Sequence, residues 1–386
     1  MLGHAREAVA TIGHAPSNGM HPRRLRIGVD AHAIGERKTG NERFIAGVLG
    51  ELAGCADHEV VAYVTERSAL DRLRDGGTHV RLMRPRSPAL RICAVLPHLA
   101  RRDRLDVLLV QGTLPPRPGC PVVSVVHDVA FARHPEHFHP LQRLWITRSL
   151  PAALRNAAGI VTVSEFSKAE IADAFGIAPE RVAVAYDGVD ARFRAAPGGR
   201  AARTRPPYVL AVGNLQPRKN LVTLVRAVTA LRRSRPDIRE RLVVAGQAAY
   251  RAGELARVAA AEGAEDAVEL LGYVSDEELV DLLHGATALA YPSVYEGFGL
   301  PVVEAMAAGA PVIASDIPVM REIAGDAALL VDPRQPQAWA AAIAAVAGDA
   351  ALRARLRTRG LQRSARYTWR SCAESVLGAL EAAAAV

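Results

Sequence analysis

A strand, a turn and a helix are predicted by the sequence Tyr291-Pro-Ser-Val-Tyr-Glu296-Gly-Phe-Gly-Leu-Pro301-Val-Val-Glu304-Ala-Met-Ala-Ala-Gly309. The apolar run 288–292 that leads into it is typical of a buried strand. Two glycines then indicate a turn, and Pro301 suits the first position of a helix, where no N–H is needed. This strand–turn–helix unit is the building block of α/β folds with a parallel sheet.

The same turn carries two carboxylates, Glu296 in the loop and Glu304 near the first turn of the helix. Backbone N–H groups at the start of a helix favour anionic groups. Carboxylates accept hydrogen bonds, so a pair of them suits a ligand with several hydroxyl groups. The stretch therefore predicts a site for a polyhydroxylated ligand that also carries a phosphate, and a sugar nucleotide fits that description.

The whole chain has the composition of a globular protein with two domains. It has 386 residues, of which 50% are hydrophobic and 23% are charged. No apolar run approaches the roughly 20 residues that span a bilayer. Residues 1–24 lack an apolar core, so we expect a disordered tail, or an extension before a start at Met20, rather than a signal peptide. These features predict a cytoplasmic protein.

Charge and cysteine content indicate no special class of partner. The net charge of +8 comes almost entirely from arginine, which is only a weak indication of nucleic-acid binding, and we expect no nucleic-acid partner. The four cysteines are far apart and form no CxxC pair: Cys55, Cys93, Cys120 and Cys372. Reduced thiols are therefore expected, rather than a metal site or a disulfide framework.

Two Rossmann-like α/β domains that face a cleft are predicted by the order of the apolar runs. In the first domain, 25–196, the expected strands are 25–30, 60–64, 107–110, 122–126 and 159–163, with helices at 41–52 and 167–175. Residues 197–207, rich in Pro, Gly and Arg, form the expected linker. In the second domain, 208–367, the expected strands are 208–212, 242–245, 268–271, 288–291 and 311–314, with helices at 276–283 and 302–308. Such doubly wound sheets bind ligands at the carboxyl ends of their strands.

Several common α/β functions lack their motifs here. The first predicted strand is followed by Asp30-Ala-His-Ala-Ile-Gly35, without the GxGxxG of dinucleotide-binding domains. The chain also contains no Walker A sequence and no GxSxG nucleophile elbow. The sequence therefore gives no indication of a dinucleotide-binding enzyme, a P-loop nucleotidase or an α/β-hydrolase.

A second candidate feature is the pair Arg218 and Lys219, which follows Gly213 at the end of a predicted strand. When the bond between a sugar and a nucleoside diphosphate breaks, the negative charge that develops on the leaving group must be stabilised by a metal or by fixed cations. The chain contains no Asp-x-Asp metal motif, so the two cations are the candidates and no metal is expected. A solvated loop pair is the alternative interpretation.

The first domain offers weaker candidates. His127 ends a predicted strand and could contact a transferred hexose or assist at the reaction centre, although a strand-end histidine is more often structural. Its neighbour Asp128 could orient the ring or cap the loop. Gly40 precedes a predicted helix and could offer N–H groups to a phosphate or an acceptor, or belong to an ordinary capped helix. Ser164 and Ser167 could likewise cap a helix or contact a ligand.

Taken together, these motifs resemble those of glycosyltransferase family 4, the retaining transferases with the GT-B architecture. The matches follow the family's order over nearly the whole chain from about residue 25. They are the Gly40 loop, His127-Asp128, Val163 to Ser167, Asp187-Gly-Val-Asp190, Arg218-Lys219-Asn220, Leu271 to Ser275, the Glu296 and Glu304 pair, and Tyr367-Thr-Trp369. Two positions depart from the pattern. Asp187 stands where Asn is common and adds a negative charge near the region between the domains, and the Gly40 loop has one glycine where many relatives have two.

The resemblance implies a role for each candidate residue. Glu296 would bind hydroxyls of the transferred hexose, Glu304 the nucleotide ribose, and Arg218 with Lys219 the diphosphate. His127 would contact the hexose near the anomeric carbon. The candidate catalytic residues are therefore those that would contact the hexose or the diphosphate, namely His127, Glu296, Arg218 and Lys219. The further donor-binding candidates are Gly40, Gly213, Tyr273, Val274, Phe298, Gly299 and Leu300. The resemblance also implies that the final helix crosses back, so that 368–386 join the first, acceptor-side domain while the second domain holds the nucleotide sugar.

The expected activity is transfer of a hexose to a glycan or a lipid-linked glycan, without a cofactor. Similarity of the loop 127–145 to mannosyltransferases of polysaccharide synthesis favours GDP-mannose as donor, with UDP-glucose and UDP-N-acetylglucosamine as alternatives. Same-face attack is expected because no carboxylate is clearly placed for a covalent intermediate.

The arginine-rich residues 81–104 could lie on the anionic inner face of a membrane, or form a solvated helix face. The alternative functions are a sugar-nucleotide 2-epimerase and a catalytically silent sugar-nucleotide-binding protein.

Overall fold

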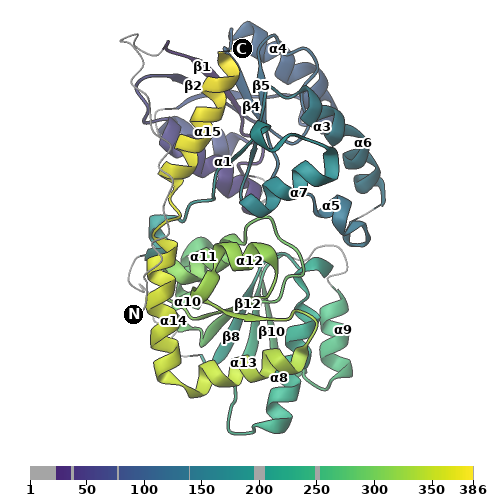
Figure 1. Cartoon of the computed structure of the whole chain (residues 1–386), viewed down its shortest axis with the longest axis vertical. Coiled ribbons are helices and arrows are strands. Elements are labelled where there is room, and N and C mark those ends of the chain that lie inside the picture. The colour runs from purple at the N-terminus through teal and green to yellow at the C-terminus, as the bar shows by residue number, and fades with distance from the viewer. Residues whose placement is uncertain are drawn as a thin grey trace, which may run out of the picture.

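The computed structural model describes residues 23–35, 39–75, 78–138, 140–194, 205–247 and 253–385 (Figure 1). They form two α/β halves that lie one above the other along the long axis, each built on a parallel sheet of its own. This architecture confirms the predicted fold class. Residues 1–22 of the predicted tail (1–24) and residues 197–204 of the predicted linker (197–207) lie outside the described residues.

The first sheet has seven parallel strands in the order β3-β2-β1-β4-β5-β6-β7. Their bounds are β1 Arg26–Asp30, β2 Glu59–Val64, β3 His79–Leu82, β4 Val107–Gln111, β5 Val122–Val125, β6 Gly159–Thr162 and β7 Val182–Val184. Both faces of this sheet are packed, because Val107 and Leu109 of β4 belong to one hydrophobic cluster while Leu108 and Val110 belong to another. Burial on both faces explains why its central strands are continuous apolar runs.

The second sheet has six parallel strands in the order β10-β9-β8-β11-β12-β13. Their bounds are β8 Tyr208–Val212, β9 Arg241–Ala245, β10 Val268–Gly272, β11 Ala288–Tyr291, β12 Val312–Ser315 and β13 Leu329–Val331. The strand order reverses between β8 and β11, as it does between β1 and β4 in the first sheet. Ligands of open α/β sheets bind outside the carboxyl ends of the strands at such a reversal.

Helices connect most successive strands in both halves, and a loop without a helix joins β4 to β5. In the first half they are α1 Thr39–Leu52, α2 Arg67–Asp75, α3 Pro88–Leu90, α4 Leu96–Arg102, α5 Ala130–Arg133, α6 Pro140–Asn156 and α7 Glu165–Phe175, with a π-helix at Arg91–Val95. In the second half they are α8 Leu221–Ser234, α9 Gly253–Ala261, α10 Asp276–Gly285, α11 Leu300–Ala307, α12 Pro318–Ile323, α13 Pro336–Gly348 and α14 Ala350–Ser364.

The last helix, α15 (Trp369–Ala384), returns to the first half (Figure 1). It packs against α1 and against strands β4 to β7. Its Trp369 ring lies directly against Gly47 of α1, and the buried Cys372 faces the carbonyl oxygen of Ala185 after β7. The first sheet is therefore covered in part by the carboxyl-terminal end of the chain.

The structure contains three strands that the sequence analysis did not predict, namely β3, β7 and β13. All three have only three or four residues, and each includes partly or fully exposed positions because it lies at or near the edge of its sheet. All four cysteines are free. Among the described residues, no helix combines the length and the apolar composition needed to cross a membrane.

Candidate active site

The turn after β11 has the geometry that the sequence predicted. β11 ends at Tyr291 and α11 begins at Leu300, with Pro301 in its first turn. Gly299, the residue before the helix, has φ of +99°, a left-handed conformation that suits glycine. Glu304 lies on α11 and is buried, and Glu296 is buried in the turn. Two carboxylates are therefore held out of water at one end of the second sheet.

Both candidate cations bind Glu296. Nη1 of Arg218 donates to Oε2 of Glu296 at 2.9 Å, and Nζ of Lys219 donates to Oε1 at 2.6 Å. Lys219 also donates to the hydroxyl of Tyr291 at 2.8 Å. Burial by itself would raise the pKa of Glu296, but the charges of Arg218 and Lys219 outweigh it and lower that pKa to about 2. Glu296 is thus ionised at all physiological pH values, and the two cations are not a solvated loop pair.

A 3₁₀ turn at 217–219, after β8, places these cations beside the Glu296 turn. Asn220, in a left-handed conformation with φ of +52°, ends the turn and donates from its amide to the carbonyl oxygens of Pro292 at 3.1 Å and Pro333 at 2.7 Å. The carbonyl oxygen of Arg218 accepts from the N–H of Val294 at 2.9 Å. The loop after β8 and the loop after β11 are therefore tied together, which fixes the cations relative to Glu296.

His127 lies after β5 in the first half. Its Nε2 is 3.2 Å from Oε1 of Gln111, at the end of β4, and its ring meets the Phe44 ring edge-on at 5.0 Å between centroids. Burial lowers the pKa of His127 to about 4, and the charge of Asp128 opposes this only in part. A neutral imidazole at physiological pH suits hydrogen bonding to a sugar hydroxyl better than charge stabilisation.

The two halves meet at Gly297, the residue after Glu296. The carbonyl oxygen of Gly297 accepts from the hydroxyls of Ser164 at 2.6 Å and Ser167 at 3.1 Å, and Gly297 lies against the carbonyl group of His127. Ser164 also caps α7 by accepting from the N–H of Ser167 at 3.0 Å. The capping interpretation is correct for Ser164 and not for Ser167, which lies inside α7, and both serines additionally bind the second half.

A second contact between the halves is made by Glu322 on α12. Its carboxylate accepts from the N–H groups of Glu165 at 2.8 Å and Phe166 at 2.9 Å, which are the first residues of α7. A carboxylate at the amino end of a helix is stabilised by the helix dipole and by the unpaired N–H groups there. The second half therefore completes the amino-terminal cap of a helix in the first half.

Glu304 is also paired with the first half. Nη1 of Arg43, on α1, contacts Oε1 of Glu304, and Nη2 of the same residue donates to Oδ1 of Asp276 at 2.5 Å. Arg43, Gln111 and Glu322 were not predicted from the sequence. Nothing in their local sequence identifies them, because each acquires its partner from an element at least 16 residues away.

The remaining donor-binding candidates differ in burial and lie on several different loops. Gly40 is exposed at the start of α1, one turn before Arg43, and Gly213 lies beneath the side chain of Lys219. Tyr273 is 51% exposed after β10, with Val274 partly buried beside it. Phe298 and Leu300 are buried, so only their backbone can meet a ligand. The structure thus brings Arg218 and Lys219 together with Glu296, sets the next residue, Gly297, against the backbone of His127, and places Tyr273 on a separate loop.

Asp187 differs from its predicted role. It is buried beside Cys372, and its Oδ1 has no hydrogen-bond partner among the described residues. Burial raises its pKa to about 8. Asp187 is therefore largely protonated at pH 7 and does not add the negative charge that the sequence suggested.

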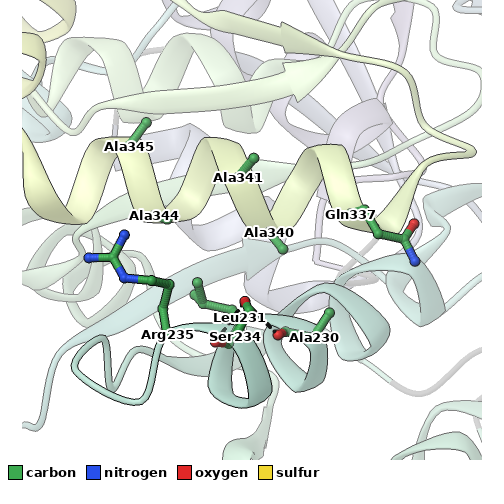
Figure 2. Close-up of a pocket in the computed structure, with 9 residues that line it drawn as sticks. All are labelled: Ala230, Leu231, Ser234, Arg235, Gln337, Ala340, Ala341, Ala344 and Ala345. Atoms are coloured by element: carbon green, nitrogen blue, oxygen red, sulfur yellow. Dashed lines mark hydrogen bonds between the residues drawn. The ribbon is translucent and has the colours of Figure 1, made fainter.

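The described residues include no group of three or more His, Cys, Asp or Glu side chains that could hold a metal ion. A pocket of about 570 Å³ lies between α8 and α13 (Figure 2). Its lining consists mainly of alanine, with Leu231, Ser234, Arg235 and Gln337, and it includes none of the candidate site residues. The chemistry predicted for this chain is therefore not located in that pocket.

Comparison with known proteins identifies the family. Residues 39–193 match the family described as Glycosyltransferase Family 4, and residues 195–363 match Glycosyl transferases group 1. The O-antigen chain mannosyltransferase B of Escherichia coli is 31% identical over 265 residues, which cover 67% of this chain and 69% of that protein. The chain belongs to glycosyltransferase family 4.

A further relative of this family 4 glycosyltransferase is the MMP α-(1→4)-mannosyltransferase of Mycolicibacterium hassiacum, 31% identical over 78% of this chain and 76% of that protein. Several other relatives are matched over about half of their own length. Among solved structures, HepE of Anabaena in complex with UDP and glucose superposes with a TM-score of 0.73 at 18% identity, covering 92% of this chain and 99% of that one. This likeness shows the GT-B fold.

Proposed function

We propose that this glycosyltransferase moves a hexose, with mannose favoured, from a nucleoside-diphosphate sugar to a glycan or lipid-linked glycan, with retention of configuration and without a metal ion. The observation that carries the proposal is the convergence of Arg218 and Lys219 on Glu296, at the point where Gly297 meets His127 of the other half. Cations, a carboxylate and a neutral imidazole are thereby gathered where a diphosphate and its hexose would lie.

Arg218 and Lys219 would hold the diphosphate while keeping Glu296 in place. The ammonium of Lys219 has three N–H donors, and among the described residues Glu296 and Tyr291 use two of them. The described residues engage Nε and Nη1 of Arg218, and its Nη2 group is available to a phosphate oxygen. Cations that are already oriented stabilise a leaving group without reorganisation during the reaction.

The two carboxylates would divide the rest of the donor between them. Glu296, ionised and fixed, would accept hydrogen bonds from hexose hydroxyls, and Glu304 would accept from the ribose. The amino end of α11 would supply backbone N–H groups to the phosphate from the residues around Gly299. His127 would bind a hydroxyl of the hexose next to the anomeric carbon.

The reaction would proceed by attack on one face of the sugar. The bond between the anomeric carbon and the diphosphate oxygen breaks as the acceptor oxygen bonds to the same face of that carbon. The proton of the acceptor hydroxyl passes to the departing phosphate oxygen, so no side chain need act as nucleophile or base. Arg218 and Lys219 stabilise the charge that develops on the diphosphate, and contact between the halves excludes water.

The donor is proposed from the relatives. The presence of mannosyltransferases among the relatives supports GDP-mannose as the donor of this chain. HepE, crystallised with UDP and glucose, supports a UDP-sugar as the alternative. The exposed Tyr273 lies on the loop where the base would bind, so the choice between guanine and uracil would be made there.

We also propose peripheral contact of the first half with an anionic membrane at the cytoplasmic side. Leu90 is 52% exposed, and Arg84, Arg86, Arg102 and Arg104 of the same segment, 81–104, are exposed as well. Arg91 is a correction to the predicted surface, because it is buried in an ion pair with Asp30. Exposed arginines beside an apolar side chain are typical of a surface that binds anionic lipid.

Sedimentation with vesicles of phosphatidylglycerol at low salt tests this contact, and recovery of all the protein in the supernatant would contradict it.

The experiment for the enzymatic proposal is a screen of purified protein against GDP-mannose, UDP-glucose, UDP-N-acetylglucosamine and their free nucleotides, in the presence of a chelator. One donor should raise the melting temperature and be slowly hydrolysed, and both effects should disappear in Glu304→Ala. The anomeric configuration of the first product, read by NMR, should match that of the donor. Folded protein that responds to no nucleotide would overturn the proposal.

A further inference from the structure

Arg43 is a residue of the first half that reaches into the proposed nucleotide site. It lies on α1, and its guanidinium contacts Glu304 on α11 and Asp276 at the start of α10, both in the second half. Its side chain is 26% exposed and packs over the Phe193 ring at 5.5 Å from the centroid, whereas the side chain of Glu304 is only 3% exposed. Arg43 therefore forms an ion pair between the two halves in which the carboxylate of Glu304 is almost completely shielded from water.

This ion pair occupies the carboxylate that the proposed function assigns to the ribose. Glu304 is buried, so its charge needs a cation or hydrogen-bond donors close by. Nη1 of Arg43 forms an ion pair with Oε1 of Glu304, and the two hydroxyls of a ribose would supply O–H donors to the same carboxylate. Arg43 contacts one oxygen of Glu304, so a ribose that hydrogen-bonds through both of its hydroxyls to both carboxylate oxygens would displace Arg43.

We propose that Arg43 is a latch that holds the empty enzyme closed and competes with the ribose for Glu304. The inference rests on the proposed role of Glu304. When the ribose binds, the guanidinium leaves Glu304 and keeps its second partner, Asp276. Asp276 also accepts from Arg192 of the first half at 2.9 Å, so contact between the halves is maintained during the exchange. Nucleotide binding and the closed state are thereby coupled through one side chain.

The latch predicts an unusual result, namely a substitution that strengthens ligand binding. Arg43→Gln removes the cation from Glu304 in the empty enzyme and leaves a buried carboxylate without its counter-charge. The nucleotide-bound enzyme loses less, because the ribose hydroxyls already satisfy Glu304. Affinity for a nucleoside diphosphate should therefore rise, by about five- to tenfold, the size of a typical coupling between sites.

The matched controls separate the latch from a general loosening of the interface. Arg192→Gln removes a cation from Asp276 and does not touch Glu304, so the nucleotide affinity should stay near that of the wild type. Arg43→Lys keeps a cation beside Glu304 and should also stay near the wild type. The gain in Arg43→Gln should be seen with GDP or UDP and be absent with the corresponding 2′,3′-dideoxynucleoside diphosphate and with pyrophosphate.

Isothermal titration of the full-length wild type and the three variants with these ligands decides the matter. Tighter binding of ribose-containing ligands in Arg43→Gln alone supports the latch. Unchanged or weaker binding in Arg43→Gln, with a wild type that binds nucleotide, overturns the latch and leaves the proposed function standing. A wild type that binds none of the ligands overturns the proposed function together with the latch.

Discussion

The carbonyl oxygen of His127 lies 2.1 Å from the position that a Cβ atom would take on Gly297. The loop that carries Glu296 therefore touches the backbone of the other half with nothing but hydrogen atoms between them. This contact brings the loop that carries the ion cluster of the second half next to the backbone of His127 in the first. It also makes the relative position of the halves sensitive to a single methyl group.

Gly297→Ala should abolish activity while leaving the protein folded. The clash is with backbone atoms of His127, so no side-chain rotation relieves it, and the halves must separate. The sheets themselves do not depend on this contact. We expect a loss of sugar transfer with an unchanged far-UV circular dichroism spectrum and a larger radius of gyration in small-angle scattering.

Gly50→Ala is the matched control, because Gly50 lies on α1 and a Cβ atom there would meet nothing within 4 Å. That substitution should leave activity unchanged and raise stability by about 0.5–1 kcal/mol, since alanine is a better helix former than glycine. Full activity of Gly297→Ala would show that the observed contact between the halves is not needed for transfer.

Glu296→Gln should remove a contribution to stability that depends on pH. The pKa of Glu296 is lowered from 4.5 to about 2, so its ionised form stabilises the folded protein above pH 4.5 and this stabilisation is lost as the pH falls towards 2. The contribution is about 3 kcal/mol at neutral pH by linkage. Urea unfolding at pH 7 and pH 3 should show a larger destabilisation by the substitution at pH 7. Equal destabilisation at both values would mean that Glu296 is not held ionised by its cations.

Asp187→Asn should stabilise the protein, and more so at higher pH. Burial raises the pKa of Asp187 from 3.8 to about 8, so the folded protein binds a proton that the unfolded chain has lost, and stability falls as the pH rises between these values. Asparagine cannot ionise and avoids this loss. The gain at pH 8 over pH 5 should be on the order of a few kcal/mol in urea unfolding.

Asp190→Asn serves as the control for Asp187, because hydrogen bonds from Arg192 hold the pKa of Asp190 below its usual range in spite of partial burial. Its effect on stability should not become more favourable between pH 5 and pH 8. A flat difference between wild type and Asp187→Asn over that interval would show that Asp187 is ionised throughout.

The imidazole of His127 should remain neutral well below the usual pH of histidine titration. Burial lowers the pKa of His127 to about 4, and Gln111 binds its Nε2 at 3.2 Å. The ¹⁵N chemical shifts of this ring should therefore show no titration between pH 5.5 and 8. A midpoint near 6.5 would contradict the neutral state and would make charge stabilisation by His127 possible.

Much of the fold follows from local sequence patterns. Runs such as Val107–Gln111 and Val122–Val125 are apolar on both faces because they lie in the middle of a parallel sheet, and such runs were recognised as strands. The strand His79–Leu82 was not recognised, because a strand at the edge of a sheet alternates between exposed and buried residues over too few positions. Edge strands gain their structure from a neighbour rather than from their own composition.

In the candidate site, the charged residues could be predicted from the local sequence, whereas their pairing could not. Glu296, Arg218 and Lys219 lie in turns with glycine or proline, and Glu304 lies near a helix start marked by Pro301, so the local sequence indicates which charged residues follow the ends of strands. Which charged residues form ion pairs depends on the packing of the two halves. Tertiary packing paired Arg218 and Lys219 with Glu296 across 78 and 77 positions, and brought Arg43 to Glu304 from the other half. The physical reason is that local patterns act through nearest neighbours along the chain, whereas an ion pair needs two groups within a few ångströms, which depends on how both sheets pack.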